Sequence, residues 1–179
     1  MRLLLATPLY PPDIAEPAPY TKELARRLAP FHEVTVLTYG HLPEKVEGVR
    51  IVAIDKRAPL VLRLVRYTKA LMREWHKADV LYTQNGPSVE LPIALARVWV
   101  RKPLFIRLGD TAAHQYASRH LLRSMLETLA LRSAQSVDAP YLQKPEILPF
   151  TPRPNSELAT WEHSWQKHLE QLQKKFDHV

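Results

Sequence analysis

Short apolar runs alternate along the chain with longer stretches in which apolar residues recur every three or four positions. The short runs predict buried strands, and the longer stretches predict amphipathic helices. Their alternation favours right-handed crossovers and a mostly parallel sheet with helices on both faces, an α/β, Rossmann-like domain. The predicted strands span residues 2–7, 33–38, 49–54, 80–83 and 104–107, and the predicted helices span residues 17–29, 60–77, 89–100 and 111–133.

The pattern weakens after residue 133. Segments 135–139 and 146–150 each predict a short strand, and prolines between them keep the chain extended and rich in turns. We therefore expect one domain at residues 1–139 and a Pro-rich connector at residues 140–154.

Residues 155–179 predict a long closing helix, with Asn155 or Ser156 as its cap. An apolar stripe at spacings of three and four must be buried against another surface. Docking on the domain is the first expectation, and a partner surface, including that of a second copy, is the alternative. The stripe comprises Leu158, Trp161, Trp165, Leu169, Leu172 and Phe176.

Composition limits the protein class. The chain has 179 residues, of which 46% are hydrophobic and 24% are charged, enough for one sizeable core. Cysteine is absent, which excludes disulfides and thiolate chemistry and is typical of a reducing compartment. No apolar run reaches the roughly 18 residues of a spanning helix, and the apolar start is too short for a signal peptide. We expect a cytoplasmic protein.

The formal net charge of +7 raises the possibility of a nucleic-acid partner, because a basic face attracts phosphates, but the placement of the charge argues against it. Much of this charge lies on one side of the predicted helix 60–77, at Arg63, Arg66, Lys69, Arg73 and Lys77. That side is either a solvated outer face or a weak contact with an anionic membrane surface, which would make the protein peripheral to a membrane. The expected core side consists of Leu60, Val61, Leu64, Val65, Leu71, Met72 and Trp75. No nucleic-acid-binding motif accompanies the charge, so we expect no nucleic-acid partner.

Several segments recur in the order of a known family. They are the strand and Pro-Pro turn at 3–12, the helix at 20–28, the strand at 33–38, and segments 48–51, 78–87 and 101–104. Together, over residues 1–139, they resemble the N-terminal half of a GT-B glycosyltransferase of retaining family 4, also called glycosyltransferase group 1. Residues 160–169 resemble the terminal helix of those enzymes, which crosses back onto the N-terminal domain.

The resemblance implies a function and a missing part. A GT-B enzyme binds its acceptor mainly with the first Rossmann-like domain and its nucleotide-sugar donor mainly with the second. Here the first domain runs through residues 140–154 directly into the closing helix. The resemblance thus implies an acceptor-side half that transfers a hexose only when a donor-binding domain is supplied in trans. The alternative is a non-catalytic or engineered Rossmann-like scaffold or interaction domain.

The loop after the Pro-Pro turn departs from the family pattern. Relatives usually carry two glycines there, which let the backbone approach the donor phosphates, whereas residues 13–19 contain no glycine and include Glu16. No metal-binding spacing or dinucleotide fingerprint is present. We expect no cofactor and no metal, and a nucleotide sugar only if a donor domain is supplied. Sixteen prolines with four glycines would also suit a stabilised scaffold.

Four residues are candidates for chemistry. Asp110 follows the strand 104–107, where ligands meet open α/β sheets and where many relatives place a polar residue near the reacting sugar; it equally suits a helix cap. His114, one turn later, faces the same cleft or solvent. Asn85, after the strand 80–83, offers hydrogen bonds to an acceptor hydroxyl, and Tyr10 flanks the Pro-rich loop. Asp110 is the catalytic candidate, and Asn85, Tyr10 and His114 are the acceptor-binding candidates.

Overall fold

The computed structural model describes residues 1–15, 17–109, 121–138 and 158–178. Its centre is a six-stranded sheet in the order β3-β2-β1-β4-β5-β6, and every neighbouring pair of strands is parallel. The strands are β1 (Arg2–Ala6), β2 (Glu33–Tyr39), β3 (Val49–Ile54), β4 (Val80–Gln84), β5 (Leu104–Arg107) and β6 (Ser136–Asp138). The predicted α/β, Rossmann-like fold is confirmed, and β6 is the strand predicted at 135–139. The strand predicted at 146–150 and the connector 140–154 lie outside the described residues.

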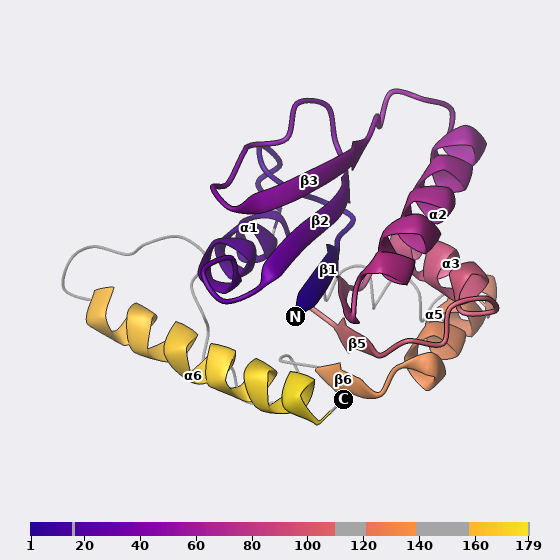
Figure 1. Cartoon of the computed structure of the whole chain (residues 1–179). Helices are drawn as coiled ribbons and strands as arrows, with labels where there is room; N and C mark the ends of the chain where they lie inside the picture. Colours follow the sequence, from indigo (N-terminus) through magenta and orange to yellow (C-terminus); the bar gives the residue numbers. More distant parts are fainter. Residues whose placement is uncertain (16, 110–120, 139–157, 179) are drawn as a thin grey trace.

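Helices cover both faces of the sheet, as Figure 1 shows. One face packs against α1 (Pro17–Leu28) and α6 (Leu158–Asp177), and the other packs against α2 (Leu60–Lys77), α3 (Pro87–Ala96) and α5 (Leu121–Ser133). The described part of the chain holds no helix whose length and apolar content would let it span a bilayer.

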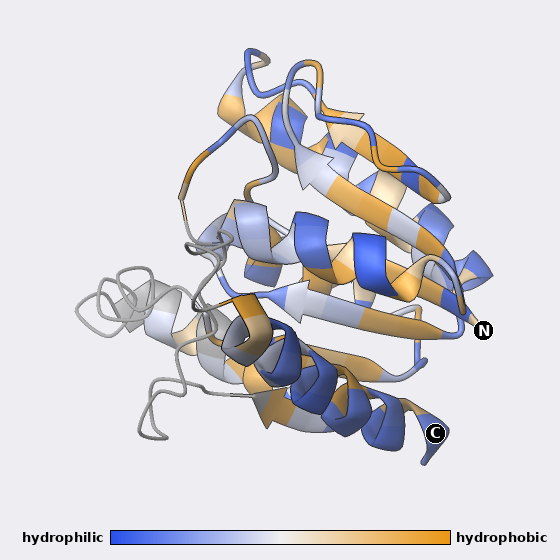
Figure 2. Cartoon of the chain, turned by 90° about the vertical axis from the view of Figure 1, so that its left-hand side faces the viewer, coloured by the Kyte–Doolittle hydropathy of each residue, from blue (hydrophilic) through white to orange (hydrophobic). Residues whose placement is uncertain are grey.

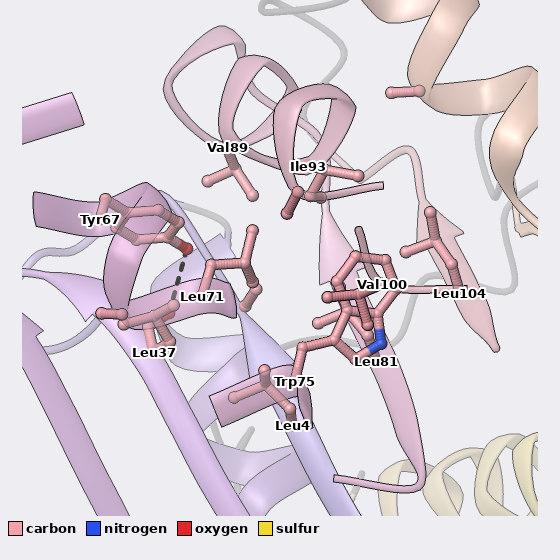
Figure 3. Packing of buried hydrophobic residues seen from close by; sticks show 14 of the residues in the cluster. Leu4, Leu37, Tyr67, Leu71, Trp75, Leu81, Val89, Ile93, Val100 and Leu104 are labelled. Carbon is pink, nitrogen blue, oxygen red and sulfur yellow. Dashed lines mark hydrogen bonds between the residues drawn. The ribbon is translucent and has the colours of Figure 1, made fainter. Parts of the chain in front are cut away.

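The pleat of β1 divides its side chains between two separate cores. Leu3 and Leu5 belong to the cluster under α1 and α6, and Leu4 and Ala6 belong to the cluster under α2 and α3. Figure 3 shows the second cluster, in which the Tyr67 hydroxyl donates a hydrogen bond to the Leu37 carbonyl oxygen at 3.3 Å. A strand buried on both faces accounts for the continuous apolar run with which the chain begins.

Both boundaries of α3 differ from the predicted ones, and α1 ends at Leu28, one residue earlier than predicted. The first residue of α3 is Pro87 rather than Val89, because Gly86 provides the bend before it and proline is favoured at the first helical position. Its last residue is Ala96 rather than Val100. The helix predicted at 111–133 is described only from Leu121 onward, as α5.

The expected core side of α2 was partly wrong. Leu71 and Trp75 are buried, but Leu60, Val61 and Val65 are exposed. With about 100° of rotation per residue, Val65 lies about 120° around the helix from Leu71. The length of α2 also contributes to the exposure of its first residues. Its 18 residues extend about 27 Å, whereas the five residues of β4 extend only about 17 Å.

The prediction that the basic residues of α2 share one outward side is wrong for Arg63. Arg63 is half-buried, with its guanidinium 5.6 Å from the centre of the Tyr39 ring and Nη1 donating to the Lys56 carbonyl oxygen at 3.0 Å. Its charge is therefore directed toward the end of the sheet. Arg66 and Lys69 remain on the exposed side, as predicted.

The closing helix docks on the domain, as predicted. Trp161, Trp165, Leu172 and Phe176 are buried, and the outward side of α6 is hydrophilic (Figure 2). Trp165 stacks on the Tyr20 ring of α1 with centroids 5.5 Å apart, and Phe176 meets Phe105 of β5 edge-on at 5.4 Å. The stripe from Trp161 to Phe176 is thus covered by the chain itself, while Leu158 at its start is exposed.

An ion pair fixes the start of α6 against α1. Arg27 donates from Nη1 and Nη2 to the two carboxylate oxygens of Glu162, at 2.8 and 2.7 Å. Its guanidinium also lies 4.9 Å from the Trp161 ring centre. The hydrogen bonds from Arg27 hold the pKa of Glu162 below its usual value. A two-point contact of this kind sets the orientation of the helix as well as its position.

We expect Trp165→Ala to lower the free energy of unfolding by about 3–5 kcal/mol, because it removes a fully buried aromatic side chain and leaves a cavity against Tyr20. Urea denaturation measures the change. Gln171→Ala, at an exposed position of the same helix, is the matched control and should stay within about 0.5 kcal/mol of the parent. Equal effects of the two substitutions would show that α6 is not docked as described.

Candidate functional site

The carboxyl ends of β4 and β5 carry the largest gathering of buried polar side chains near the sheet centre. Gln84 ends β4, Asn85 follows it, and Arg107 ends β5; all three are buried. The backbone N–H of Asn85 donates to the Arg107 carbonyl oxygen at 2.9 Å. Open α/β sheets bind ligands beyond the carboxyl ends of their strands, at the point where the strand order reverses. In this sheet that point lies between β1 and β4.

The loops that leave β1 and β4 are in close contact. Gly86 has a φ of 150°, and a Cβ atom added to it would lie 3.3 Å from Cγ of Pro8. Below this contact, the Thr83 hydroxyl donates to the Ala6 carbonyl oxygen at 3.0 Å. Glycine is therefore needed at position 86 for its backbone conformation and for the approach of the neighbouring loop.

The first turn of α3 is capped by a carboxylate from within the helix. The Gly86 N–H donates to Oε1 of the buried Glu90 at 3.0 Å, and the N–H groups of Val89 and Glu90 donate to the Gly86 carbonyl oxygen. A helix N-terminus attracts anions because its amides are unpaired and its dipole is positive there. Here the chain's own carboxylate occupies that position, so the Gly86 amide is already used.

Arg107 is the central charged group of this edge. It is only 4% exposed, its guanidinium lies 3.9 Å from the centre of the Tyr20 ring, and its Nη1 donates to Oε1 of Gln84 at 3.3 Å. A desolvated guanidinium over an aromatic face gains a favourable cation–π interaction.

Tyr20 continues these contacts to α6. Its hydroxyl is hydrogen-bonded to the Tyr82 hydroxyl at 2.9 Å and to Nε2 of His168 at 2.7 Å. We call Gln84, Arg107, Tyr20, Tyr82 and His168 the Arg107 network. The network joins the carboxyl end of β5 to α1 and to α6, so the docked closing helix supports this edge of the sheet.

Gly109 allows the Arg107 side chain to fold under the loop after β5. A Cβ atom at Gly109 would lie 2.1 Å from Nη1 of Arg107 and 3.0 Å from Oε1 of Gln84. Asp110 is the residue of this segment that the sequence pattern predicted as functional, whereas Arg107 and Gly109 were not predicted. A strand that ends in arginine and is followed within two residues by glycine was the available signal.

The structure places two of the four predicted site residues. Asn85 lies buried at the carboxyl end of β4, and Tyr10 lies buried in the core cluster under α1 and α6. Asp110 and His114 lie outside the described residues, so the four are not brought together here, and their roles stay predictions. Among the described residues, no three His, Asp or Glu side chains are grouped as metal ligands.

The Tyr10 hydroxyl has no hydrogen-bond partner among the described residues. Burial, together with the negative charge of Glu44, raises the pKa of Tyr10 to about 12. Core packing therefore explains why an aromatic residue stands at position 10. The hydroxyl of Tyr10 makes no hydrogen bond within the described part of the chain.

Comparison with protein families gives one match. The model of the glycosyl transferase 4-like domain matches residues 16–140, more than half of the chain. The matched region ends before α6. It contains Asn85, Arg107 and Gly109, and all but β1 of the sheet.

Among solved structures, the crystal structure of the C-terminal domain of the coenzyme A biosynthesis bifunctional protein CoaBC is similar. It has a TM-score of 0.52 and 12% sequence identity, over 99% of this chain and 96% of that one. At this identity the likeness concerns the fold alone. A comparison with curated protein sequences gives no match.

Gly109→Ala should lower the free energy of unfolding by about 1–3 kcal/mol, because the new methyl group overlaps Nη1 of Arg107 and forces the guanidinium away from Tyr20. Gly40→Ala is the matched control, since a Cβ there meets nothing within 4 Å. It should change stability by less than about 0.5 kcal/mol. Urea denaturation of both variants gives the comparison, and a neutral Gly109→Ala would contradict the described position of Arg107.

Tyr10→Phe should leave the free energy of unfolding unchanged or raise it by up to about 1 kcal/mol, because it removes a buried hydroxyl without a partner. Tyr20→Phe, whose hydroxyl is paired twice, should lose about 1–2 kcal/mol. Urea denaturation at neutral pH measures both.

The pH dependence of Tyr10→Phe gives a second readout. The unfolded chain loses the Tyr10 proton near pH 10, whereas the folded chain keeps it to about pH 12. Deprotonation thus favours unfolding, and the stability due to Tyr10 declines as the pH rises through this interval. The variant should lose less stability than the parent between these values, and an equal loss would show that Tyr10 is not buried as described.

Proposed function

Because the chain belongs to the glycosyl transferase 4-like family, we propose that it supplies the acceptor side of a nucleotide-sugar-dependent glycosyltransferase. In this proposal a second, donor-binding domain supplied in trans completes the active site, and a hexose is transferred in the cleft between the two. The observation that carries the proposal is the family match over residues 16–140.

The polar edge at β4 and β5 suits an acceptor site. Asn85 and Gln84 carry amide groups of the kind that donate to and accept from sugar hydroxyls. Both are buried, so an acceptor reaches them only if the groups that cover them move. Asp110 follows Gly109, against which the Arg107 guanidinium lies. We propose Asp110 as the catalytic residue that contacts the reacting sugar, with His114 and Asn85 on the acceptor. Tyr10 can contact an acceptor only if the loop after β1 moves, since its hydroxyl is buried.

Two contacts support a donor site on another domain. The Gly86 amide at the start of α3 is bonded to Glu90, and Gly86 is packed against Pro8. A pyrophosphate placed at this helix terminus would have to displace a buried carboxylate and would be repelled by it. We therefore assign the donor phosphates to the second domain, and we expect the chain alone to be inactive. Half a cleft cannot position both substrates and stabilise the charge of the transition state.

The test is a titration of the chain with UDP-glucose, UDP-N-acetylglucosamine and GDP-mannose by calorimetry, alone and mixed with the donor-binding domain of a family member. We expect no binding alone, and binding with release of nucleoside diphosphate from the mixture in the presence of sugar acceptors. Asp110→Asn should abolish that release, while Gly40→Ala, a substitution in open space, should not. Turnover by the isolated chain would contradict the proposal.

A second candidate is a non-catalytic scaffold or interaction domain that retains the fold. The self-capped α3 terminus favours it, because the chain's own Glu90 occupies a position typical of ligands in this fold. No release of nucleoside diphosphate by any mixture would support this candidate over the first.

A further inference from the structure

The amino-terminal half of α2 presents an apolar surface that the core does not use. Four aliphatic side chains in its first two turns are exposed: Leu60 by 57%, Val61 by 74%, Leu62 by 42% and Val65 by 45%. Exposed aliphatic side chains are ordinary when scattered, but Val61, Leu62 and Val65 lie within about 100° of arc around the helix and form a contiguous patch, which Leu60 precedes in the first turn. The patch is distinct from the Arg107 network, which lies at β4, β5, α1 and α6.

Basic residues follow the apolar ones along the same side of the helix. Leu62, Arg66, Lys69 and Arg73 succeed one another at spacings of four, three and four, which places them in one row on the helix surface. Val61 and Val65 form the adjacent row. The exposed side is thus apolar in its first two turns and cationic in the following ones. We call Leu60, Val61, Leu62, Val65, Arg66 and Lys69 the α2 patch.

The cations of the patch are not neutralised by neighbouring carboxylates. Within the described part of the chain, neither Arg66 nor Lys69 has an ion pair. The single acidic residue of α2, Glu74, is buried and is bonded to Arg50 and Arg73. No exposed carboxylate on this helix would therefore oppose an anionic surface.

The acidic residues near the start of α2 are also paired. Asp55 accepts from Arg57 at 2.9 Å, and Asp13 accepts from Lys56 at 2.8 Å. The surroundings of the apolar turns are accordingly neutral or positive.

We propose that the α2 patch docks this protein onto an anionic phospholipid surface. The aliphatic side chains enter the boundary between headgroups and acyl chains, and Arg66 and Lys69 lie against the phosphates. The combination of exposed aliphatic residues with unpaired cations favours lipid over other partners. A second copy seated on the same patch would bring like charges together, and a nucleic acid would leave the aliphatic side chains without a partner. The proposal does not depend on glycosyl transfer.

The experiment is flotation of the whole chain with two kinds of vesicle, one of pure phosphatidylcholine and one of phosphatidylcholine and phosphatidylglycerol in equal parts. We expect binding to the mixed vesicles and not to the neutral ones, with weaker binding at higher salt. Val61→Ser/Val65→Ser and Arg66→Gln/Lys69→Gln should each reduce the partition coefficient by about tenfold. All four positions are exposed, and circular dichroism confirms that the variants are folded.

Val98→Ser/Arg101→Gln is the matched control, since it removes one exposed aliphatic and one exposed basic side chain outside α2. It should bind the mixed vesicles as the parent does. A parent chain that does not float with anionic vesicles would overturn the proposal, as would equal losses in the control and the α2 variants. Self-association or binding of duplex DNA that the α2 substitutions abolish, without vesicle binding, would assign the patch to that partner instead.

Discussion

The packing of α6 over β4 and β5 is the contact on which the other features of the structure depend. In the observed strand order, the connections after β3 place α2, α3 and α5 on one face, and α1 lies on the other face with β1 and β2. Among the described elements, no connecting helix covers the α1 face of β4 and β5. Phe176 covers this face by meeting Tyr82 and Phe105 edge-on, and Trp165 closes the seam against Tyr20. Burial of these aromatic side chains is the main free-energy gain of that face.

The same contact reaches the candidate site. The Tyr20 ring stacks on Trp165 of α6 and also lies against the Arg107 guanidinium. Its hydroxyl is hydrogen-bonded to His168 and to Tyr82. Arg107 in turn occupies the space that Gly109 leaves open. The surroundings of Gly109 are thus connected, through Arg107 and Tyr20, to a helix more than fifty residues later in the chain.

The fold was predictable from the sequence to a large extent, and the site only in part. Apolar runs and helical periodicity identified the six strands of the sheet, the bounds of α2 and the docking of α6, because burial imposes these patterns directly. The Arg107 network was missed since its members lie on four different elements and meet only after the sheet and α6 have assembled. Tyr10 was selected by its place beside a Pro-rich loop, but neighbourhood in the sequence does not determine whether a side chain points into a cleft or a core. Local sequence patterns identify helices and strands, whereas a site depends on which of these elements the tertiary structure brings together.

The contrast between α2 and α6 shows the limit of periodicity most clearly. Both helices have an apolar stripe, and in α6 the stripe is covered from Trp161 to Phe176. In α2 the core covers Tyr67 to Trp75, while the aliphatic residues of the first two turns remain exposed. Periodicity states that apolar residues share a side, and it does not state what lies against that side. An exposed aliphatic end that continues into unpaired cations is therefore informative about partners in a way that a covered stripe is not, because no part of the described fold accounts for it.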